Sequence, residues 1–405
     1  MSIERTGVSV GLGEVSPRGS RQQWRRSSVA PFEDGFAVGT ADGTVRALEA
    51  DGSERWRESG EEMAVALAGS ATGLAVGTRG DRGRIRLLGD SGEEQWSYDT
   101  ADDLCGPAKD TLFWYPYVVD VIAGEARLYA AARRYERDGD ERVWRSAVYA
   151  FESDGGVRWR YETDASPIAL SLGDDRLAVA NNRCGGDHDR GLVVLDAATG
   201  TPVADWDPGT EGERRVGDVS LSGGAIAAAS HGDYRGYLLG AESAEKRWAA
   251  DLGVEREIGD ETLYAYPNHA HLAADATVFV TGNTFPAEGR EAEGRHPNEH
   301  TITAISREDG DRLWSAPVGG FVGEVAASGG RVAVPYAQHF RDRDPEAHAL
   351  RVFDAAEGPV REIESGGIVT AAALSGDRVA FVEEPVEYHD EGDVRGEYRL
   401  HVESM

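Results

Sequence analysis

A short unit that ends in tryptophan recurs along this chain and constrains its fold more than any other feature. Residues 47–56, 150–159 and 304–314 each read as a strand, an Asp-Gly turn and a second strand that carries a Trp. A two-stranded unit of this kind cannot bury its own faces and is marginal in water. It must stack against copies of itself, so the repeat predicts an array of small β-sheets.

Two further strand patterns recur with the same period, roughly every 50 residues. The first runs begin at Phe36, Leu74, Leu128, Leu177, Ile226, Val278, Val332 and Val379. The second runs begin at Val45, Ile85, Val148, Leu192, Tyr237, Ile302, Leu350 and Tyr398. Each pattern occurs eight times. We therefore predict an all-β chain that folds as an eight-bladed β-propeller of four-stranded antiparallel blades.

The last repeat ends at the C-terminus before its Trp-bearing strand, and Trp24 supplies such a strand near the N-terminus. We predict that residues 21–27 pair with the last blade and close the ring, which removes the exposed sheet edges. The predicted domain is 21–405, with blades near 30–60, 61–100, 110–163, 165–208, 215–252, 262–317, 321–365 and 367–405 plus 21–27. Residues 1–20 form an extension without a predicted place. The predicted blade-docking residues are Trp24, Trp56, Trp96, Trp159, Trp206, Trp248 and Trp314.

Ala304, Gly310 and Trp314 have the spacing Ala-x-Asp-x-x-x-Gly-x-x-x-Trp, with Ser306 in place of the Asp. This pattern resembles the PQQ-type repeat of the quinoprotein dehydrogenases and the BamB-like propellers, in which each Trp docks on the next blade. The resemblance covers roughly residues 20–405 and implies the fold. The quinoproteins use an adjacent Cys-Cys pair and calcium beneath the quinone. No Cys-Cys occurs here, so we expect no PQQ and no other cofactor.

The formal net charge is −30, from 72 acidic and 42 basic residues, and Lys109 and Lys246 are the only lysines. This balance resembles halophilic proteins, in which molar salt shortens the Debye length to about 3 Å. It disfavours nucleic acid as a partner, because phosphate binding needs a basic face. No apolar run is long enough to span a membrane, and no signal peptide is recognisable, so we expect a cytoplasmic protein. Cys105 and Cys184 are expected to be free thiols, with a disulfide or metal pair as the alternative.

Long connections fall on one predicted face of the propeller. They include residues 133–145, 181–190, 284–300, 338–348 and 383–397, whereas the turns before the Trp strands are short. Long loops on a rigid scaffold usually carry the binding site. The plainer interpretation is that acidic, Gly-rich loops are merely solvated.

Aromatic and polar residues gather where the innermost strands and these loops begin. The residues predicted to line a funnel at the channel mouth are Tyr115, Tyr117, Arg133, Arg183, His231, Tyr266, Asn268, Asn283, Tyr336, Gln338 and His339. Such a funnel suits a peptide or a small ligand, although Tyr-Pro pairs also occur simply as strand entries. His269 and His271 lie two residues apart and face the same side of a strand, as two metal ligands would. Two histidines alone do not define a metal site.

No phosphate-binding loop, nucleophile elbow or His-Glu-x-x-His motif occurs in the sequence. The sequence therefore favours a non-catalytic, cytoplasmic scaffold that binds a protein or peptide through its long-loop face. An enzyme or sensor that uses the central funnel, with or without a metal, is the alternative. The sequence does not indicate the oligomeric state.

Overall fold

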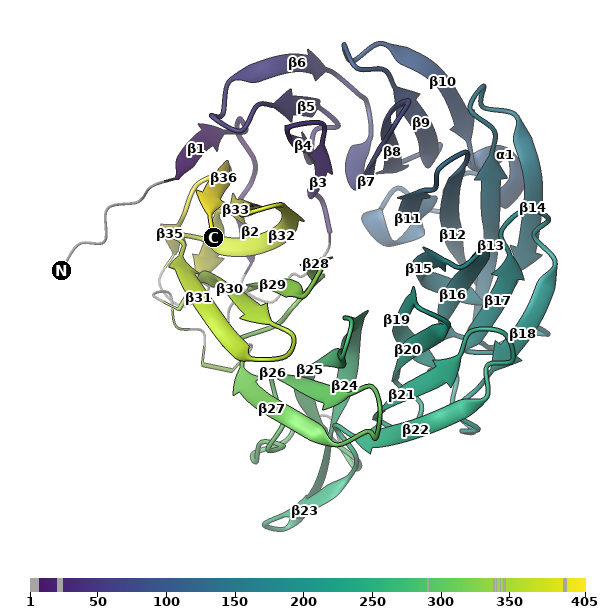
Figure 1. Ribbon diagram of the computed structural model, residues 1–405, viewed down its shortest axis with the longest axis vertical. Helices are drawn as coiled ribbons and strands as arrows, with labels where there is room; N and C mark the ends of the chain where they lie inside the picture. The colour runs from purple at the N-terminus through teal and green to yellow at the C-terminus, as the bar shows by residue number, and fades with distance from the viewer. Residues whose placement is uncertain are drawn as a thin grey trace.

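The computed structural model describes residues 7–19, 25–289, 291–337, 339, 341–342, 344, 347–388 and 392–405. Antiparallel sheets stand around a central axis, and each runs from an inner strand at the axis to an outer strand at the rim (Figure 1). The inner strands pack side by side around the axis, and β32 contacts β3 where the ring closes. The predicted all-β propeller is confirmed.

The first three repeats form two sheets. The sheet β3–β6 has the strands β3 (Ser28–Phe32), β4 (Gly35–Gly39), β5 (Val45–Leu48) and β6 (Glu54–Glu58). The next meander is β7 (Met63–Ser70), β8 (Gly73–Arg79), β9 (Arg84–Leu88) and β10 (Glu94–Asp99). The third is β11 (Tyr117–Ala123), β12 (Leu128–Asp138), β13 (Glu141–Phe151) and β14 (Val157–Thr163). One pairing, Tyr117 with Arg79, joins the last two meanders. Helix α1 (Ala101–Leu104) and the 3-10 turn η1 (Leu112–Trp114) connect them.

Four further sheets complete the ring. The first is β15 (Ser166–Gly173), β16 (Arg176–Arg183), β17 (Leu192–Asp196) and β18 (Pro202–Trp206). The second is β19 (Val216–Ser222), β20 (Ala225–Ser230), β21 (Arg235–Gly240) and β22 (Lys246–Asp251). The five-stranded third is β23 (Arg256–Ile258), β24 (Glu261–Leu272), β25 (Ala276–Pro286), β26 (Thr301–Ser306) and β27 (Arg312–Pro317). The fourth is β28 (Ala326–Ser328), β29 (Arg331–Tyr336), β30 (Ala349–Asp354) and β31 (Gly358–Glu364).

The closing sheet joins the two ends of the chain. It contains β32 (Ile368–Ser375), β33 (Arg378–Glu384) and β36 (Arg399–Ser404), with β1 (Val8–Gly11) as its outer strand. β1 pairs antiparallel with β36, from Val8 opposite Val402 to Gly11 opposite Arg399. A small separate sheet holds β2 (Arg18–Gly19), β34 (Val386–Tyr388) and β35 (Asp393–Arg395).

The position predicted for the closing strand is therefore wrong, although an N-terminal strand does close the ring. The predicted strand was 21–27, and Trp24 lies outside the described residues. Val8–Gly11 takes the place instead, so part of the predicted extension 1–20 belongs to the propeller. Arg25 and Arg26 form ion pairs with Glu324 and Glu384 rather than pairing with β36.

Tryptophan rings lie against turn glycines of the next blade. A side chain at Gly200 would place its Cβ 2.5 Å from the ring of Trp159. The indole Nε1 of Trp159 donates to the Ala197 carbonyl at 3.0 Å. The same ring-on-glycine arrangement occurs at the pairs Trp56–Gly92, Trp96–Gly155, Trp248–Gly310 and Trp314–Gly358. Trp206 instead packs on Tyr237, with 4.6 Å between ring centroids.

Hydrophobic side chains fill the space between adjacent blades. One such cluster contains Tyr129, Trp159 and Leu177 from neighbouring sheets. At the closing junction, Val8 and Val10 lie against Gly52, the turn glycine of the first sheet. Val8 therefore occupies the place that a tryptophan holds at other junctions.

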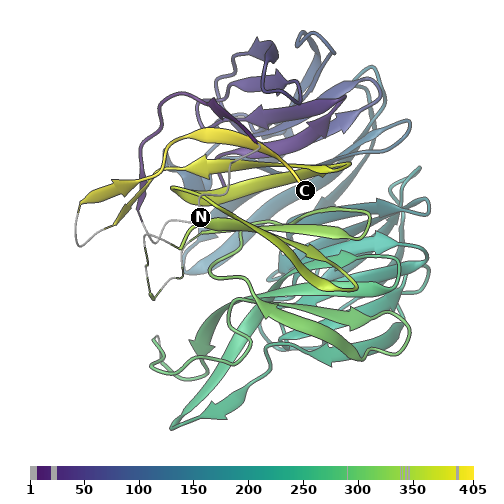
Figure 2. The same cartoon turned by 60° about the vertical axis from the view of Figure 1, so that its left-hand side comes forward.

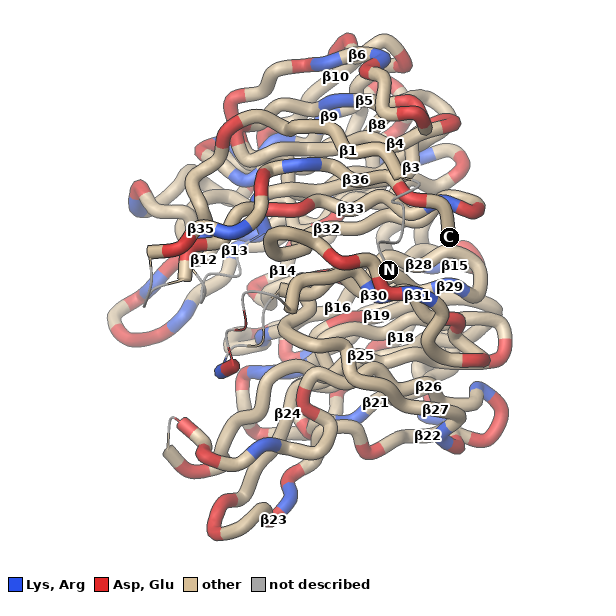
Figure 3. Tube along the Cα trace, turned by 90° about the vertical axis from the view of Figure 1, so that its left-hand side faces the viewer, with Lys and Arg blue, Asp and Glu red and all other residues tan. Residues whose placement is uncertain are grey.

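One face of the ring carries the projecting segments. The paired ends of β12 and β13, the β34–β35 hairpin and β23–β24 extend on the same side (Figures 2 and 3). Residues 133–145, expected to be mainly loop, continue these strands instead, with Asp138 paired to Glu141 at the tip. Acidic residues are spread over the whole molecule, and arginines are interspersed among them (Figure 3).

Candidate functional site

Two adjoining cavities lie at the centre of the ring. The larger has a volume of about 620 Å³ and is bounded mainly by the inner strands and the segments that precede them. The smaller has a volume of about 210 Å³. Arg25, Val119, Ile168 and Gly323 line both cavities, so the two form one continuous channel space.

Carboxylates at the waist of this channel connect the inner strands. Asp120 of β11 accepts a hydrogen bond from the Leu170 N–H of β15 at 2.8 Å. In the same way, Asp218 accepts from the Ala270 N–H at 3.0 Å, and Glu324 accepts from the Ala372 N–H at 3.1 Å. Inner strands of neighbouring blades do not share a full ladder, so these bonds satisfy backbone donors that would otherwise be orphaned.

Arg25 lies among these carboxylates. Its Nη2 is 2.9 Å from Oε2 of Glu324. Burial acts to lower the pKa of Arg25, but Glu324, Asp120 and Asp218 raise it above its ordinary value. Burial raises the pKa of Asp120 to about 7, against the opposing effects of the Leu170 N–H and Arg25. The waist acids therefore have structural partners.

Above the waist, four arginines from successive blades form what we call the cationic mouth: Arg79, Arg133, Arg183 and Arg214. Arg79 and Arg183 end β8 and β16, and Arg133 lies in β12. Arg214 precedes β19 and forms an isolated bridge with Arg183. Second strands of three blades and the segment before β19 thus bring four cations together.

Arginine elsewhere in this protein usually meets a carboxylate, but two members of the cationic mouth do not. Arg133 donates to Ser166 Oγ at 2.5 Å and to the Pro167 carbonyl at 3.3 Å. Arg214 lies over the ring of Tyr266 at 4.6 Å. Within the described residues, neither guanidinium forms an ion pair.

Burial lowers the pKa of arginines in the cationic mouth, which shows that their charged form is destabilised there. Burial, with contributions from Arg79 and Arg183, lowers the pKa of Arg133 to about 10. Burial, with contributions from Arg214 and Arg142, likewise lowers the pKa of Arg183, although Arg183 contacts Glu213 at 3.0 Å. Carboxylates raise the pKa of Arg86 and Arg235 despite burial. Arg133 is therefore a buried cation that no carboxylate among the described residues offsets.

Aromatic rings form the walls of the cationic mouth. Tyr117 lies between Arg79 and Arg133, at 4.7 and 5.5 Å from the two guanidinium carbons. The ring of Trp144 lies 5.3 Å from the Arg133 guanidinium carbon and packs at a tilt of 57° against Tyr135, with 5.0 Å between ring centroids. Tyr135 also contacts Phe113 at 4.3 Å. Cation–π contacts keep a guanidinium in place while leaving its N–H groups available to a ligand.

Many of the predicted funnel residues are at the channel, but they divide between its two parts. His231, Tyr266, Asn268 and Asn283 line the larger cavity, together with His269 and His271. Tyr115, Tyr117 and Arg133 line the smaller one. Burial and Arg214 lower the pKa of His231 to about 3, so its ring is neutral at pH 7.

Two predicted residues lie away from this site, and a third lies outside the described residues. Tyr336 is buried in the core against Gly319, and only 3% of it is exposed. The prediction for Tyr336 depended on an aromatic residue at the end of a strand. Packing in the core accounts for such a residue equally well. His339 lies near Glu299 and His300 in the long-loop region. Gln338 lies outside the described residues.

Among the described residues, no third metal ligand joins the predicted pair of His269 and His271. His269 Nε2–H donates to the Val322 carbonyl at 3.0 Å, and its Nδ1 lies 3.5 Å from the Asp218 carboxylate. His271 is largely buried, and burial lowers its pKa. Within the described residues, the metal-competent group is Glu299, His300 and His339, which the sequence analysis had not grouped.

Sequence reasoning missed Arg79 and Arg214. A usable signal existed for Arg79, because Leu74 and Arg79 have the same separation as Leu128 and Arg133. Aligning the second strands by their first apolar residue would have placed both arginines at one level of the ring. Arg214 precedes its strand and has no such repeat signal.

The two cysteines are free thiols, as expected, and do not meet. Cys105 is exposed and Cys184 is buried. Burial raises the pKa of the Cys184 thiol to about 12, which makes it a weak nucleophile. None of the helices in the described part of the chain has the length and apolar character needed to cross a membrane.

Radial sheets around a channel, with elaborated loops and a cationic mouth on one face, define this chain as a β-propeller. A family model described as outer membrane protein assembly factor BamB matches residues 41–284, and the chain belongs to this family. No curated protein sequence matches the chain.

Solved structures support the fold. BamB from Moraxella catarrhalis matches with a TM-score of 0.60 and 15% identity, over 99% of this chain and all of that one. The Dos1 propeller matches with a TM-score of 0.54 and 12% identity, over 95% of this chain and 94% of that one. The Cps50 (Swd1) propeller domain of Myceliophteria thermophila has a TM-score of 0.47 at 12% identity, over 95% and 97% of the two chains.

Proposed function

We propose that this protein is a non-catalytic scaffold that binds an acidic segment of a partner protein at the cationic mouth. The observation that carries the proposal is the pair Arg133 and Arg214. In a chain with 72 acidic residues, these two guanidiniums form no ion pair within the described residues. A carboxylate from a partner would relieve the mutual repulsion and accept paired N–H donors.

The surroundings suit a peptide. Aromatic walls and a channel entrance give apolar contact beside the charged groups, which is the usual composition of a recognition site. The family description names an assembly factor, and an assembly factor acts on other proteins. We extend that role to this chain in its general form, as partner binding, and place it in the cytoplasm. Recovery of the native protein with the cell envelope after fractionation would contradict that location.

The direct test is binding of a labelled ten-residue peptide rich in Glu and Asp with one aromatic residue, followed by fluorescence anisotropy. Charge-assisted hydrogen bonds are each worth about 1.5–3 kcal/mol, so Arg133→Gln combined with Arg214→Gln is expected to weaken binding at least tenfold. Arg378→Gln is the matched control, because Arg378 is exposed on the opposite face at the start of β33. Equal binding by the double variant and the wild type would contradict the proposal.

A small ligand in the larger cavity is the second candidate. Buried polar atoms of His231 and Asn283 face that cavity without a hydrogen-bond partner of ordinary geometry in the described chain. Small carboxylates such as succinate or citrate, titrated against the same variants, separate the two cases. Tight binding of a small carboxylate that also excludes the peptide would favour this candidate.

A further inference from the structure

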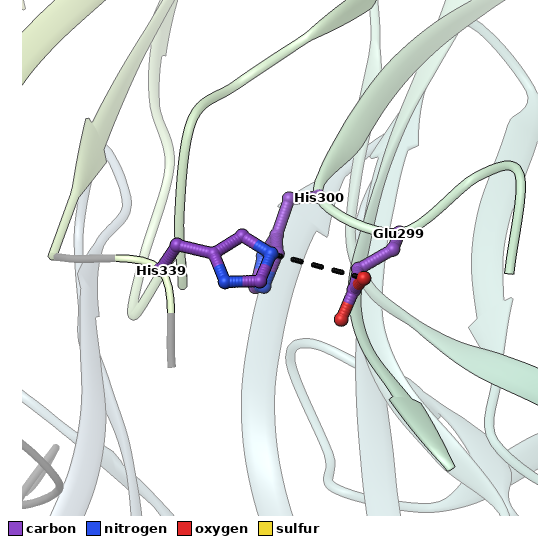
Figure 4. A group of neighbouring side chains, drawn as sticks. All are labelled: Glu299, His300 and His339. Carbon is purple, nitrogen blue, oxygen red and sulfur yellow. Dashed lines mark ion pairs between the residues drawn. The ribbon is translucent and has the colours of Figure 1, made fainter. Parts of the chain in front are cut away.

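A second cluster of chemically competent side chains lies away from the cationic mouth, between two loops of neighbouring blades. Glu299 and His300 end the β25–β26 connection, and His339 follows β29. One ligand atom from each of the three lies within 4.8 Å of the others. Figure 4 shows His339 turned toward the Glu299 carboxylate, with His300 beside it.

The cluster is buried and incompletely satisfied. Only 3% of His300 is exposed, and neither of its ring nitrogens makes a hydrogen bond of ordinary geometry within the described chain. Oε1 of Glu299 accepts from the Thr284 N–H at 3.2 Å, whereas Oε2 makes no hydrogen bond of ordinary geometry to any described residue. Buried polar atoms are rarely left without partners, so these orphans indicate a missing ligand.

The three groups face a common point. Oε2 of Glu299 is 3.7 Å from Nε2 of His339, and the rings of His300 and His339 are 4.8 Å apart at 68°. Arg295 approaches Oε2 of Glu299 only to 3.9 Å. Other histidines in this region are occupied: His296 uses both ring nitrogens, on the Val254 carbonyl and the Asn298 N–H.

The backbone also holds His300 in an unusual conformation. Its φ is +47°, in the left-handed region that a residue with a side chain seldom adopts. Its N–H donates to the Gly282 carbonyl at 3.1 Å, and its carbonyl accepts from the Val318 N–H at 2.8 Å. Strain of this kind persists where surrounding structure enforces it, and it often marks a ligand site.

We propose that Glu299, His300 and His339 bind a divalent transition-metal ion of the Zn²⁺ class. Two imidazoles and one carboxylate, with room for water, suit such an ion. The ion would join the 284–300 connection to the segment after β29. Arg341 of that segment already donates to the Gly294 carbonyl of the connection at 2.7 Å.

His339 is held through its Nδ1, which accepts from the N–H groups of Arg341 and Asp342 at 3.1 and 3.3 Å, so the proton of the ring is on Nε2. Ligation through Nε2 requires the other tautomer, in which Nδ1–H gives up these two contacts and donates to the Asp342 carboxylate, now 3.6 Å away. A carboxylate that accepts from the far nitrogen of a ligating histidine is a common supporting contact.

The test is equilibrium binding of ZnCl₂ to tag-free, metal-stripped protein, read by isothermal titration calorimetry and elemental analysis after dialysis. We expect the wild type to bind one equivalent of Zn²⁺ with micromolar or tighter affinity. The affinity should fall at least 100-fold in His300→Ala and in His339→Ala. Asp342→Asn is expected to lose about 10-fold. His188→Ala is the control, because His188 is an exposed histidine paired with Asp164. Binding of Co²⁺ should add visible absorption from a nitrogen and oxygen ligand set.

A melting curve of each variant without metal distinguishes a loss of folding from the loss of a metal ligand. His339→Ala is the safer variant in this respect, because His339 lies in a loop rather than in the core. Zn²⁺ affinity that is the same in His300→Ala, His339→Ala and His188→Ala would overturn the proposal. So would the absence of binding by the wild type. Peptide binding plays no part in this test, so the result is independent of the proposed function.

Discussion

At the scale of single residues, the contact between a tryptophan ring and a turn glycine holds neighbouring blades together. The turn requires a positive φ, which is +72° at Gly200. The ring of Trp159 occupies the space where a Cβ would lie. The glycine is therefore needed twice, once for the turn and once for the docking of the ring.

A pair of alanine substitutions separates these two requirements. Gly200→Ala should lower the free energy of unfolding by about 3 kcal/mol, because it adds a clash with Trp159 to the backbone cost. Gly209→Ala should cost only about 1 kcal/mol, because Gly209 has a similar φ of +77° but no atom within 4 Å of the added Cβ. Denaturant unfolding followed by tryptophan fluorescence measures both. Equal costs would show that the ring contact contributes nothing.

Asp120 should make stability depend on pH. Its folded pKa, about 7, exceeds the unfolded value, so the folded state favours the protonated form. This contribution is fully present below about pH 4 and is lost as the pH rises through 7. Asp120→Asn should therefore stabilise the protein at pH 8, and the difference should shrink as the pH falls to 4. A difference that is constant with pH, measured by thermal melting, would contradict this assignment.

The sequence predicts these residues unevenly. The tryptophans were recognisable because a large ring recurs at one place in the repeat. The grouping of Arg133 with Arg79 and Arg214 was only partly visible, since it follows from the packing of consecutive blades around the axis. His300 gave no signal at all, because its unpartnered nitrogens follow from burial by loops that have no repeat.

At the scale of strands, β1 and a buried ion cluster fasten the N-terminal segment to the last sheet. Glu384 is fully buried and accepts from Arg18 and Arg26, each at 2.6 Å. Ser27 and Thr370 also donate to this carboxylate, at 2.9 and 2.8 Å. Burial acts to raise the pKa of Glu384, but Arg18 and Arg26 hold it below its ordinary value.

A charge placed on the inner face of β1 tests the closure. Val8→Asp should destabilise the protein by about 2–4 kcal/mol, because Val8 contacts the turn at Gly52 and the new carboxylate would be partly buried there. Ser9→Asp is the control: Ser9 is exposed and already contacts Arg399. Thermal melting of both variants gives the answer. A melting temperature for Val8→Asp no lower than that for Ser9→Asp would show that β1 does not fasten the ring.

The closing strand also shows where sequence reasoning fails. The repeat predicts a tryptophan in the closing strand, and Trp24 is the tryptophan nearest to the N-terminus. The structure uses Val8, whose smaller side chain fills the same gap over a turn glycine. Long hairpins such as β12–β13 were read as loops for a related reason, since their charged residues hide the strand pattern beyond Arg133.

At the scale of the whole molecule, the net charge of −30 should make folding depend on salt. Repulsion among exposed carboxylates acts over about 10 Å in 0.1 M salt and about 3 Å in 1 M salt. The melting temperature should therefore rise with KCl. Sucrose, which is uncharged, is the control for general exclusion from the protein surface. A melting temperature that does not change between 0.05 and 2 M KCl would contradict the halophilic interpretation.

The propeller fold explains why four arginines from different repeats lie together. Packing of successive blades around one axis brings these side chains to one level of the channel, whereas a single blade would carry only one of them. The waist acids are occupied by backbone N–H groups and by Arg25, so they do not neutralise Arg133 and Arg214. A protein with so strong an acid excess thus keeps a local site for anions.

The most direct measurement is a crystal structure of the protein with the acidic peptide, at the lowest KCl concentration in which the protein stays folded. We predict peptide carboxylate oxygens within about 3 Å of the guanidinium nitrogens of Arg133 and Arg214. A peptide bound on another surface, with the cationic mouth open to solvent, would contradict it.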